Sequence, residues 1–169
     1  MPSSIRVVLL ALGAVVVCTC VSIPAQAFAQ HAHEHASGAA AVGNMKFDAG
    51  RKWSTDAPLR SGMAGIRTAF EADHGAIHDG RETDAQYETL AARIESQVES
   101  IVANCKLPAA ADENLHYVVA DLAQGVNLMR GKDPERTRHD GAALVHGALL
   151  AYGKYFNDPG WTAIAAGEY

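Results

Sequence analysis

The sequence lacks several features that would place it in a common functional class. Lys and Arg total 14 against 19 Asp and Glu, and this acidic balance, with a net charge of −5, argues against a nucleic-acid-binding protein. β-branched residues are sparse after residue 30, where alanine dominates the apolar residues, so a large sheet is not expected. Neither a Gly-x-Ser-x-Gly motif nor a glycine-rich phosphate loop is present, and we expect no enzymatic activity.

The N-terminal residues have the three parts of a secretory signal peptide. Arg6 is followed by an apolar run over residues 7–17, and small-x-small cleavage patterns end at Ala27 and Ala29. The run is short for a membrane span, which needs about 20 residues, and an uncleaved membrane anchor is the alternative. We therefore expect residues 1–27 to be a signal peptide and the protein to be periplasmic, without stable membrane insertion after cleavage.

Cleavage would also leave the mature chain almost without cysteine. Removal of residues 1–27 leaves 142 residues (169 − 27) and takes away Cys18 and Cys20, so Cys105 alone remains. No intramolecular disulfide is then possible. A lone thiol in an oxidising compartment is buried, metal-bound or paired with another chain, and the last case would make the protein a homodimer.

Histidine is the residue type that the chain has in excess, with eight copies. Residues 28–50 are rich in Ala, Gly and His and have no apolar period, which predicts a flexible tail. Within it, His31, His33 and His35 alternate along the chain. Alternating imidazoles on a flexible chain can bind Cu²⁺, Zn²⁺ or Ni²⁺; the alternative is a solvated tail with no ligand.

The remaining residues, 51–169, are predicted to form four amphipathic helices. Start signals are Asp56, the capping box at Thr83–Gln86, and Asp133 followed by Pro134. The expected apolar seams are Leu59, Met63, Ile66, Phe70 and Ile77; Tyr87, Leu90, Ile94, Val98, Ile101 and Cys105; Ala111, Leu115, Val118, Leu122, Val126 and Met129; and Val145, Leu149, Tyr152 and Phe156. Helices of about 22 residues joined by short connections predict an all-α, antiparallel up-down-up-down four-helix bundle.

Parts of the first and fourth helices resemble the soluble periplasmic cytochromes of the b and c-prime types. Ala57–Met63 is similar to the start of the b-type family, in which a methionine ligates haem iron. Ala151–Tyr155 is similar to its end, where a histidine stands in place of Gly153. The Cys-x-x-Cys-His motif of covalent haem attachment is absent. The resemblance implies haem binding, with Met63 as one axial ligand and His146 as the core partner.

A second resemblance spans nearly the whole mature chain. It rests on three segments, Lys52–Met63, Asn104–Pro108 and Asp158–Trp161. These segments are similar to a family of small exported proteobacterial proteins that are often labelled DnrO-like. The resemblance implies export and carries no established chemistry.

Candidate metal ligands gather near both ends of the expected bundle. His74 and His78 are four residues apart, which places both imidazoles on one helix face, and His139 belongs to the same end. They could hold a metal ion, or simply be exposed histidines that the helix dipole favours. His146 is either a ligand that faces the core or a residue at its boundary.

The opposite end combines Cys105, His116 and Met63. A thiolate, an imidazole and a thioether together suit copper, Cu(I) above all, although all three also occur as ordinary core or boundary residues. The sequence therefore predicts a periplasmic transition-metal-binding protein, for copper or zinc, that stores, delivers or protects the metal ion. A haem-binding electron carrier of cytochrome b type and a cofactor-free bundle that binds a protein partner are the alternatives.

Overall fold

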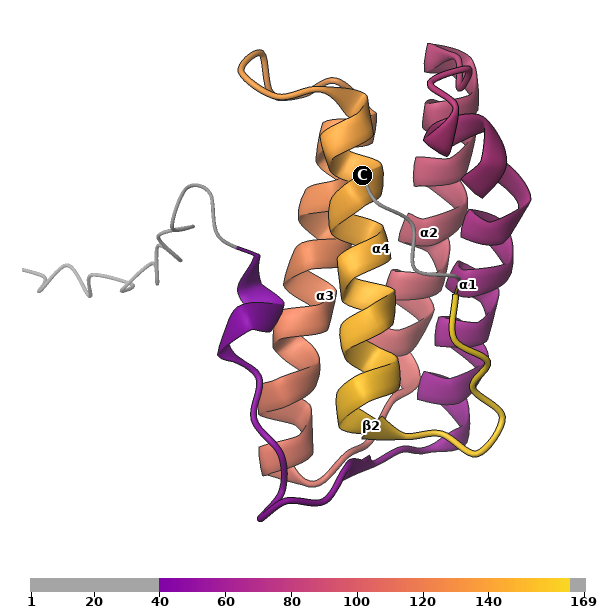
Figure 1. Ribbon diagram of the computed structural model, residues 1–169. Coiled ribbons are helices and arrows are strands. Elements are labelled where there is room, and N and C mark those ends of the chain that lie inside the picture. Colours follow the sequence, from indigo (N-terminus) through magenta and orange to yellow (C-terminus); the bar gives the residue numbers. More distant parts are fainter. Residues whose placement is uncertain (1–39, 165–169) are drawn as a thin grey trace, which may run out of the picture. The chain divides into compact units, whose positions relative to one another are not determined.

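Four helices form the body of the protein in a computed structural model that describes residues 40–164 (Figure 1). They are α1 (Ala57–His78), α2 (Asp84–Asn104), α3 (Ala109–Met129) and α4 (Arg138–Tyr155). Short loops join consecutive helices at alternating ends, and the predicted all-α four-helix bundle is confirmed. Within these residues, every helix is too short or too polar to be a candidate membrane span.

Local capping fixes the starts of the first two helices where the sequence predicts them. The Asp56 carboxylate accepts a hydrogen bond from the Leu59 amide at 2.9 Å. Thr83 and Gln86 form the reciprocal capping box of α2. These contacts satisfy amides that have no partner inside the helix, which is why the signals can be read from a few neighbouring residues.

The fourth helix begins later than the sequence predicts, and the expected start at Asp133 and Pro134 is wrong. Asp133 instead accepts a hydrogen bond from the Glu135 amide at 2.9 Å, in a turn that precedes the helix. Thr137 caps α4 in a capping box with Asp140, and the helix has 18 residues rather than about 22. A Thr-x-x-Asp sequence has the capping-box spacing, so the true start also had a local signal.

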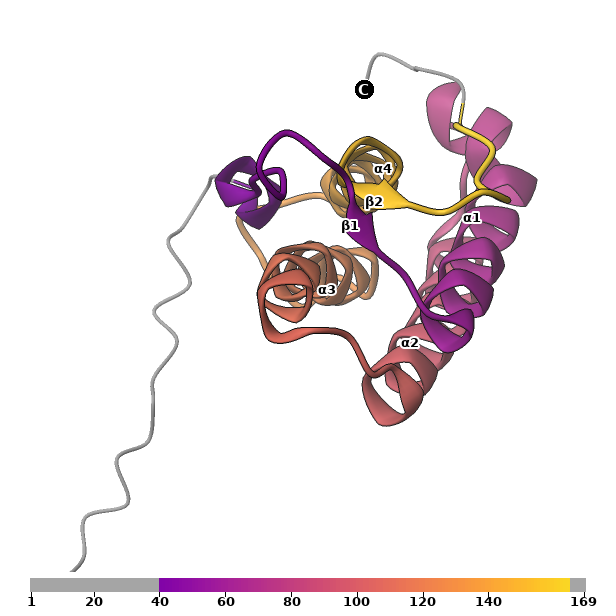
Figure 2. The same ribbon diagram turned by 90° about the horizontal axis from the view of Figure 1, so that it is seen from below.

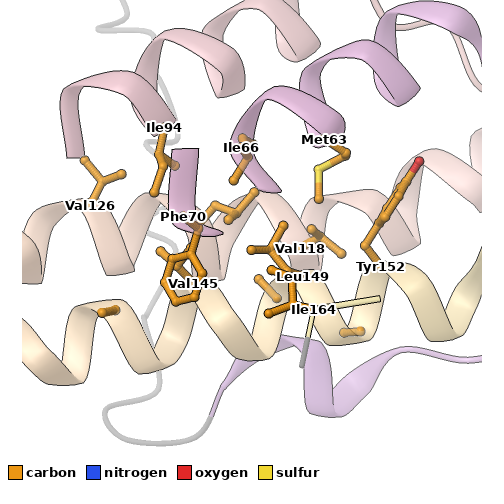
Figure 3. Packing of buried hydrophobic residues seen from close by; sticks show 14 of the residues in the cluster. Met63, Ile66, Phe70, Ile94, Val118, Val126, Val145, Leu149, Tyr152 and Ile164 are labelled. Atoms are coloured by element: carbon orange, nitrogen blue, oxygen red, sulfur yellow. The ribbon is translucent and has the colours of Figure 1, made fainter. Parts of the chain in front are cut away.

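The core consists of the predicted apolar seams (Figure 3). Every expected seam residue is buried except Val98 and Cys105, which are partly buried. α3 packs most extensively against α4, followed by α1 against α2 and α2 against α3, whereas α1 and α4 approach each other closely at few positions. The interface between α1 and α4 is therefore the least extensive one between neighbouring helices.

Two glycines allow the close approach of α3 and α4. A Cβ atom at Gly141 would lie 2.6 Å from the carbonyl oxygen of Gly125 and 2.7 Å from the amide nitrogen of Met129. A Cβ at Gly125 would lie 2.7 Å from the carbonyl oxygen of Gly141. Because these neighbours are backbone atoms, a side chain at either position would force the helices apart.

Residues 40–52 form an N-terminal strap along α3. The strap begins with the 3₁₀-helix η1 (Ala41–Asn44). Asp121 of α3 is 1% exposed, and its two carboxylate oxygens accept hydrogen bonds from the amides of Ala41, at 2.7 Å, and Val42, at 3.0 Å. One buried carboxylate thus holds the start of the strap.

A second buried polar residue holds the middle of the strap. Asn114 lies one heptad before Asp121 on α3, and its Oδ1 accepts a hydrogen bond from the Lys46 amide at 2.9 Å. Met45, the residue before Lys46, is buried. The prediction of a flexible tail is therefore wrong for residues 40–50, because the acceptors that order them lie 68 to 80 residues further along the sequence, and the local composition does not reveal them.

The segment after α4 pairs with the residues that follow the strap and folds back on α4. β1 (Trp53–Ser54) pairs in parallel with β2 (Phe156–Asn157), the short exception to an all-helical fold (Figure 2). The Tyr152 hydroxyl then donates a hydrogen bond to Asp158 at 3.0 Å. Trp161 packs edge-on against the Tyr152 ring, with ring centroids 4.7 Å apart. These contacts fix the chain as it leaves the bundle.

We expect Gly141→Ala to destabilise the protein by about 1–3 kcal/mol, because the new methyl group overpacks the contact between α3 and α4. Gly147→Ala is the matched control on the same helix, since a Cβ there meets no atom within 4 Å. It should raise stability by up to about 1 kcal/mol through helix propensity. Urea unfolding measures both; equal effects of the two substitutions would contradict the packing argument.

We expect Asp121→Ala to release the strap and to cost about 2–4 kcal/mol, since two amides lose a charged acceptor. Asp121→Asn keeps one acceptor oxygen and should have a smaller effect. The direct measurement is amide hydrogen exchange of the strap, which should accelerate at Ala41 and Val42 in Asp121→Ala. Unchanged exchange there would mean that apolar packing alone holds the strap.

Candidate functional site

A groove between α2 and α3 brings together two of the predicted metal ligands. Cys105 follows the last residue of α2 and His116 lies on α3, and both line the groove together with Asp112. The groove has a volume of about 500 Å³ and is otherwise apolar. Met63, the third predicted member of this set, is fully buried in the core and does not line the groove.

The surroundings of Cys105 keep its thiol protonated. Burial is the main cause that raises the pKa of Cys105 to about 11, and the negative charges of Asp56 and Asp112 add to it. A hydrogen bond from the thiol to the Asp56 carboxylate acts in the same direction. Asp56 also caps α1 and accepts a hydrogen bond from the Lys106 amide at 2.6 Å, so one carboxylate fixes the loop that carries the thiol.

His116 is oriented by a backbone carbonyl one helical turn before it. Its Nδ1 atom lies 2.8 Å from the carbonyl oxygen of Asp112. A carbonyl oxygen can only accept a hydrogen bond, so Nδ1 carries the proton. In the neutral ring Nε2 is then the basic nitrogen, on a side chain that is 73% exposed. A histidine that donates one ring N–H to a carbonyl is the usual arrangement of a metal ligand.

At the opposite end, the two members of the predicted pair His74 and His78 have different surroundings. The His78 ring is exposed, and its Nδ1 lies 3.4 Å from a carboxylate oxygen of Asp79. The His74 ring lies in contact with Phe70 of its own helix and with His146 of α4, with ring centroids 5.8 Å apart in both cases. His139 is half-buried near the start of α4.

The structure gives no support to the haem ligand pair Met63 and His146. His146 is 3% exposed and stacks on Phe70 with an angle of 5° between the ring planes. Met63 precedes Phe70 by one heptad, about 10 Å along α1, so the two proposed axial ligands reach the core at different levels. The Trp161 indole lies directly over Gly153, where the cytochrome resemblance would place a histidine. The Trp161 side chain therefore occupies the space that a histidine at position 153 would need.

The predicted metal ligands divide between the described residues and the N-terminal tail. Among residues 40–164, no group of three or more His, Cys, Asp or Glu side chains is arranged to hold a metal ion. The histidines of the tail (His31, His33 and His35) and the predicted signal peptide lie outside the described residues.

Sequence reasoning missed the residues that surround these histidines and the cysteine. The four-residue spacing of Asp112 and His116 on one helix was a readable signal for their contact. Asp56 approaches Cys105 from a position 49 residues away (105 − 56), and Phe70 contacts His146 across two helices. Neither contact leaves a local pattern in the sequence.

We expect alkylation of Cys105 by iodoacetamide at pH 8 to be about a hundredfold slower in the folded protein than in urea. The thiolate is the reactive form, and an unperturbed thiol with a pKa of about 8.5 is far more ionised at that pH. The folded rate should rise with pH up to about 11. Asp112→Asn removes one charge that raises the pKa and should accelerate alkylation, whereas the charge-matched control Asp84→Asn should not. Equal rates in all forms would contradict this account of the thiol.

No protein-family model, curated protein or solved structure matches the chain. The two family resemblances and the predicted export to the periplasm therefore stay predictions.

Proposed function

We propose that the protein is a periplasmic copper-binding protein that stores, delivers or protects the metal ion, and that Cys105 and His116 bind Cu(I) in the groove. One observation carries the proposal. The Asp112 carbonyl fixes the proton of His116 on Nδ1, which leaves Nε2 as the basic nitrogen of a ring that lines the same groove as the only free thiol among residues 40–164.

The ligand types favour a soft ion. Thiolates select Cu(I), and imidazoles suit copper and zinc. Zn²⁺ sites usually need three or four protein ligands, whereas Cu(I) is stable with two or three. A groove with one thiol and one imidazole therefore fits Cu(I) better than Zn²⁺.

The raised pKa of Cys105 makes the thiol proton a competitor of any ion that binds there. Any ion must displace the thiol proton, which at pH 7 lowers the apparent affinity by about 10⁴-fold relative to a free thiolate. Only an ion with a high affinity for thiolate overcomes this competition. The negative charge of Asp112 then offsets the positive charge of the bound ion.

The N-terminal tail would bind copper in its other oxidation state, Cu²⁺. His31, His33 and His35 offer imidazoles only, which suit Cu²⁺. A tail that captures Cu²⁺ and a groove that holds Cu(I) would together bind both forms of copper.

One observation favours a second candidate, the cofactor-free bundle that binds a protein partner. Val102 lines the groove and is 67% exposed, although it is a large apolar residue. An exposed apolar residue beside a groove is compatible with a partner surface. Metal titration separates the two candidates, because the partner-binding bundle has no use for the thiol and the imidazole as ligands.

We expect Cys105→Ser to weaken Cu(I) binding at the groove by at least about a hundredfold, more than the loss of an outer-shell partner costs at known sites. It should leave Cu²⁺ binding intact. Substitution of His31, His33 and His35 by alanine should do the reverse. Cu²⁺ should also leave the tail as the pH falls through about 6.5, where unperturbed imidazoles take up a proton. Titration of each variant with each ion provides the measurement; if both variants bind both ions like the parent, the copper proposal is wrong.

A further inference from the structure

We propose that His74 and His146 form a second, interior site for a univalent d¹⁰ metal ion, Cu(I) or Ag(I), between α1 and α4. The site shares only the class of ion with the proposed function and has no residue in common with the groove. It pairs His74 with a partner on another helix, in place of His78 on its own helix.

The separation of the two rings fits two imidazoles on one ion. The ring centroids are 5.8 Å apart and the ring planes are tilted by 50°. With metal–nitrogen bonds of about 2.0 Å, two rings bound to one ion have centroids at most about 6.3 Å apart, when the bonds are collinear, and about 5.1 Å apart at the tetrahedral angle. The observed distance lies between these limits and nearer the collinear one. The 5.8 Å between the centroids is therefore compatible with two imidazoles on one ion, and Cu(I) and Ag(I) are ions that need no more than two such ligands.

The burial of the pair favours a single positive charge. His146 is 3% exposed, and the Nε2 atom of His74 is inaccessible to solvent. Phe70 contacts both rings, with centroids 5.8 Å away in each case. Neutral imidazoles bring no charge to compensate the ion, and the cost of burying a charge rises with its square. A univalent ion thus suits the pair better than Zn²⁺ or Cu²⁺.

The pair lies at the least extensive interface between neighbouring helices of the bundle. α1 and α4 approach each other closely at few positions, in contrast to the closely packed pairs α1–α2 and α3–α4. His74 lies near the end of α1 and is half-buried. The interface that holds the two histidines is therefore the one that can open to an ion with the least loss of packing.

Silver(I), a redox-inert substitute for Cu(I), tests the site in the full chain. Protein with ¹⁵N-labelled histidine is titrated stepwise with Ag(I), one equivalent at a time, at neutral pH and followed by NMR. We expect ring nitrogens of both His74 and His146 to show one-bond coupling to silver at the same equivalent. Saturation with Ag(I) without coupling at these two residues would overturn the proposal, and this measurement needs no substitution.

Three matched substitutions count the ions. His74→Phe and His146→Phe keep an aromatic ring in the cluster and remove the nitrogen ligands, and each should lower the Ag(I) stoichiometry by one. His78→Phe is the same change on the exposed face of α1 and should leave the stoichiometry unchanged. Circular dichroism confirms that each variant is folded. Parent stoichiometry in both interior variants, or a loss in His78→Phe, would contradict the site.

Cys105→Ser separates this proposal from the groove site. If both sites exist, this variant loses the groove ion and keeps silver coupling at His74 and His146. If the groove site fails and the interior site holds, Cys105→Ser binds like the parent while the interior variants do not. Loss of the coupling at the two histidines in Cys105→Ser would mean that they do not form a site of their own.

Discussion

The contact between Gly125 and Gly141 is the constraint on which the arrangement of the helices depends. With backbone atoms where side chains would otherwise stand, α3 and α4 approach closely and form the most extensive helix pair. α1 and α4 approach each other closely at fewer positions, and the rings of Phe70, His74 and His146 lie in that interface. The most extensive helix contact is thus built around residues without side chains, and the least extensive one between neighbouring helices contains aromatic rings.

Single buried polar side chains likewise hold several parts of the fold together. Asp121 and Asn114 lie on α3 at levels one heptad apart, and each binds backbone amides of the strap. Asp56 caps α1, accepts a hydrogen bond from the Lys106 amide and adds to the effect of burial that raises the pKa of the Cys105 thiol. Each of these residues satisfies buried or half-buried hydrogen-bonding groups that would otherwise destabilise the fold. The chemistry of Cys105 is therefore coupled to the stability of the loop that carries it.

The four helices, most of their ends and nearly all core residues could be predicted because each depends on neighbours in the sequence. Thr83 and Gln86 are three residues apart, and the seam from Leu59 to Ile77 follows the helical period. The strap could not be predicted, since Ala41 is ordered by a carboxylate 80 residues away. The pairing of His74 with His146 depends on the relative rotation and offset of α1 and α4, which no local pattern encodes. Cys105 and His116 were placed at the same end correctly, because short loops determine which helix ends are neighbours.

The parallel pairing of β1 with β2 has a consequence for the order of folding. Trp53 pairs with Phe156, so these two short strands close a loop of 103 residues (156 − 53). The chain entropy lost in closing so long a loop is recovered only when the helices between the strands have already brought the ends together. The strand pair is then the last element to form and the first to open. Native-state fluctuations should begin at this end of the molecule, with the strap and the segment after α4 separating while the four helices remain intact.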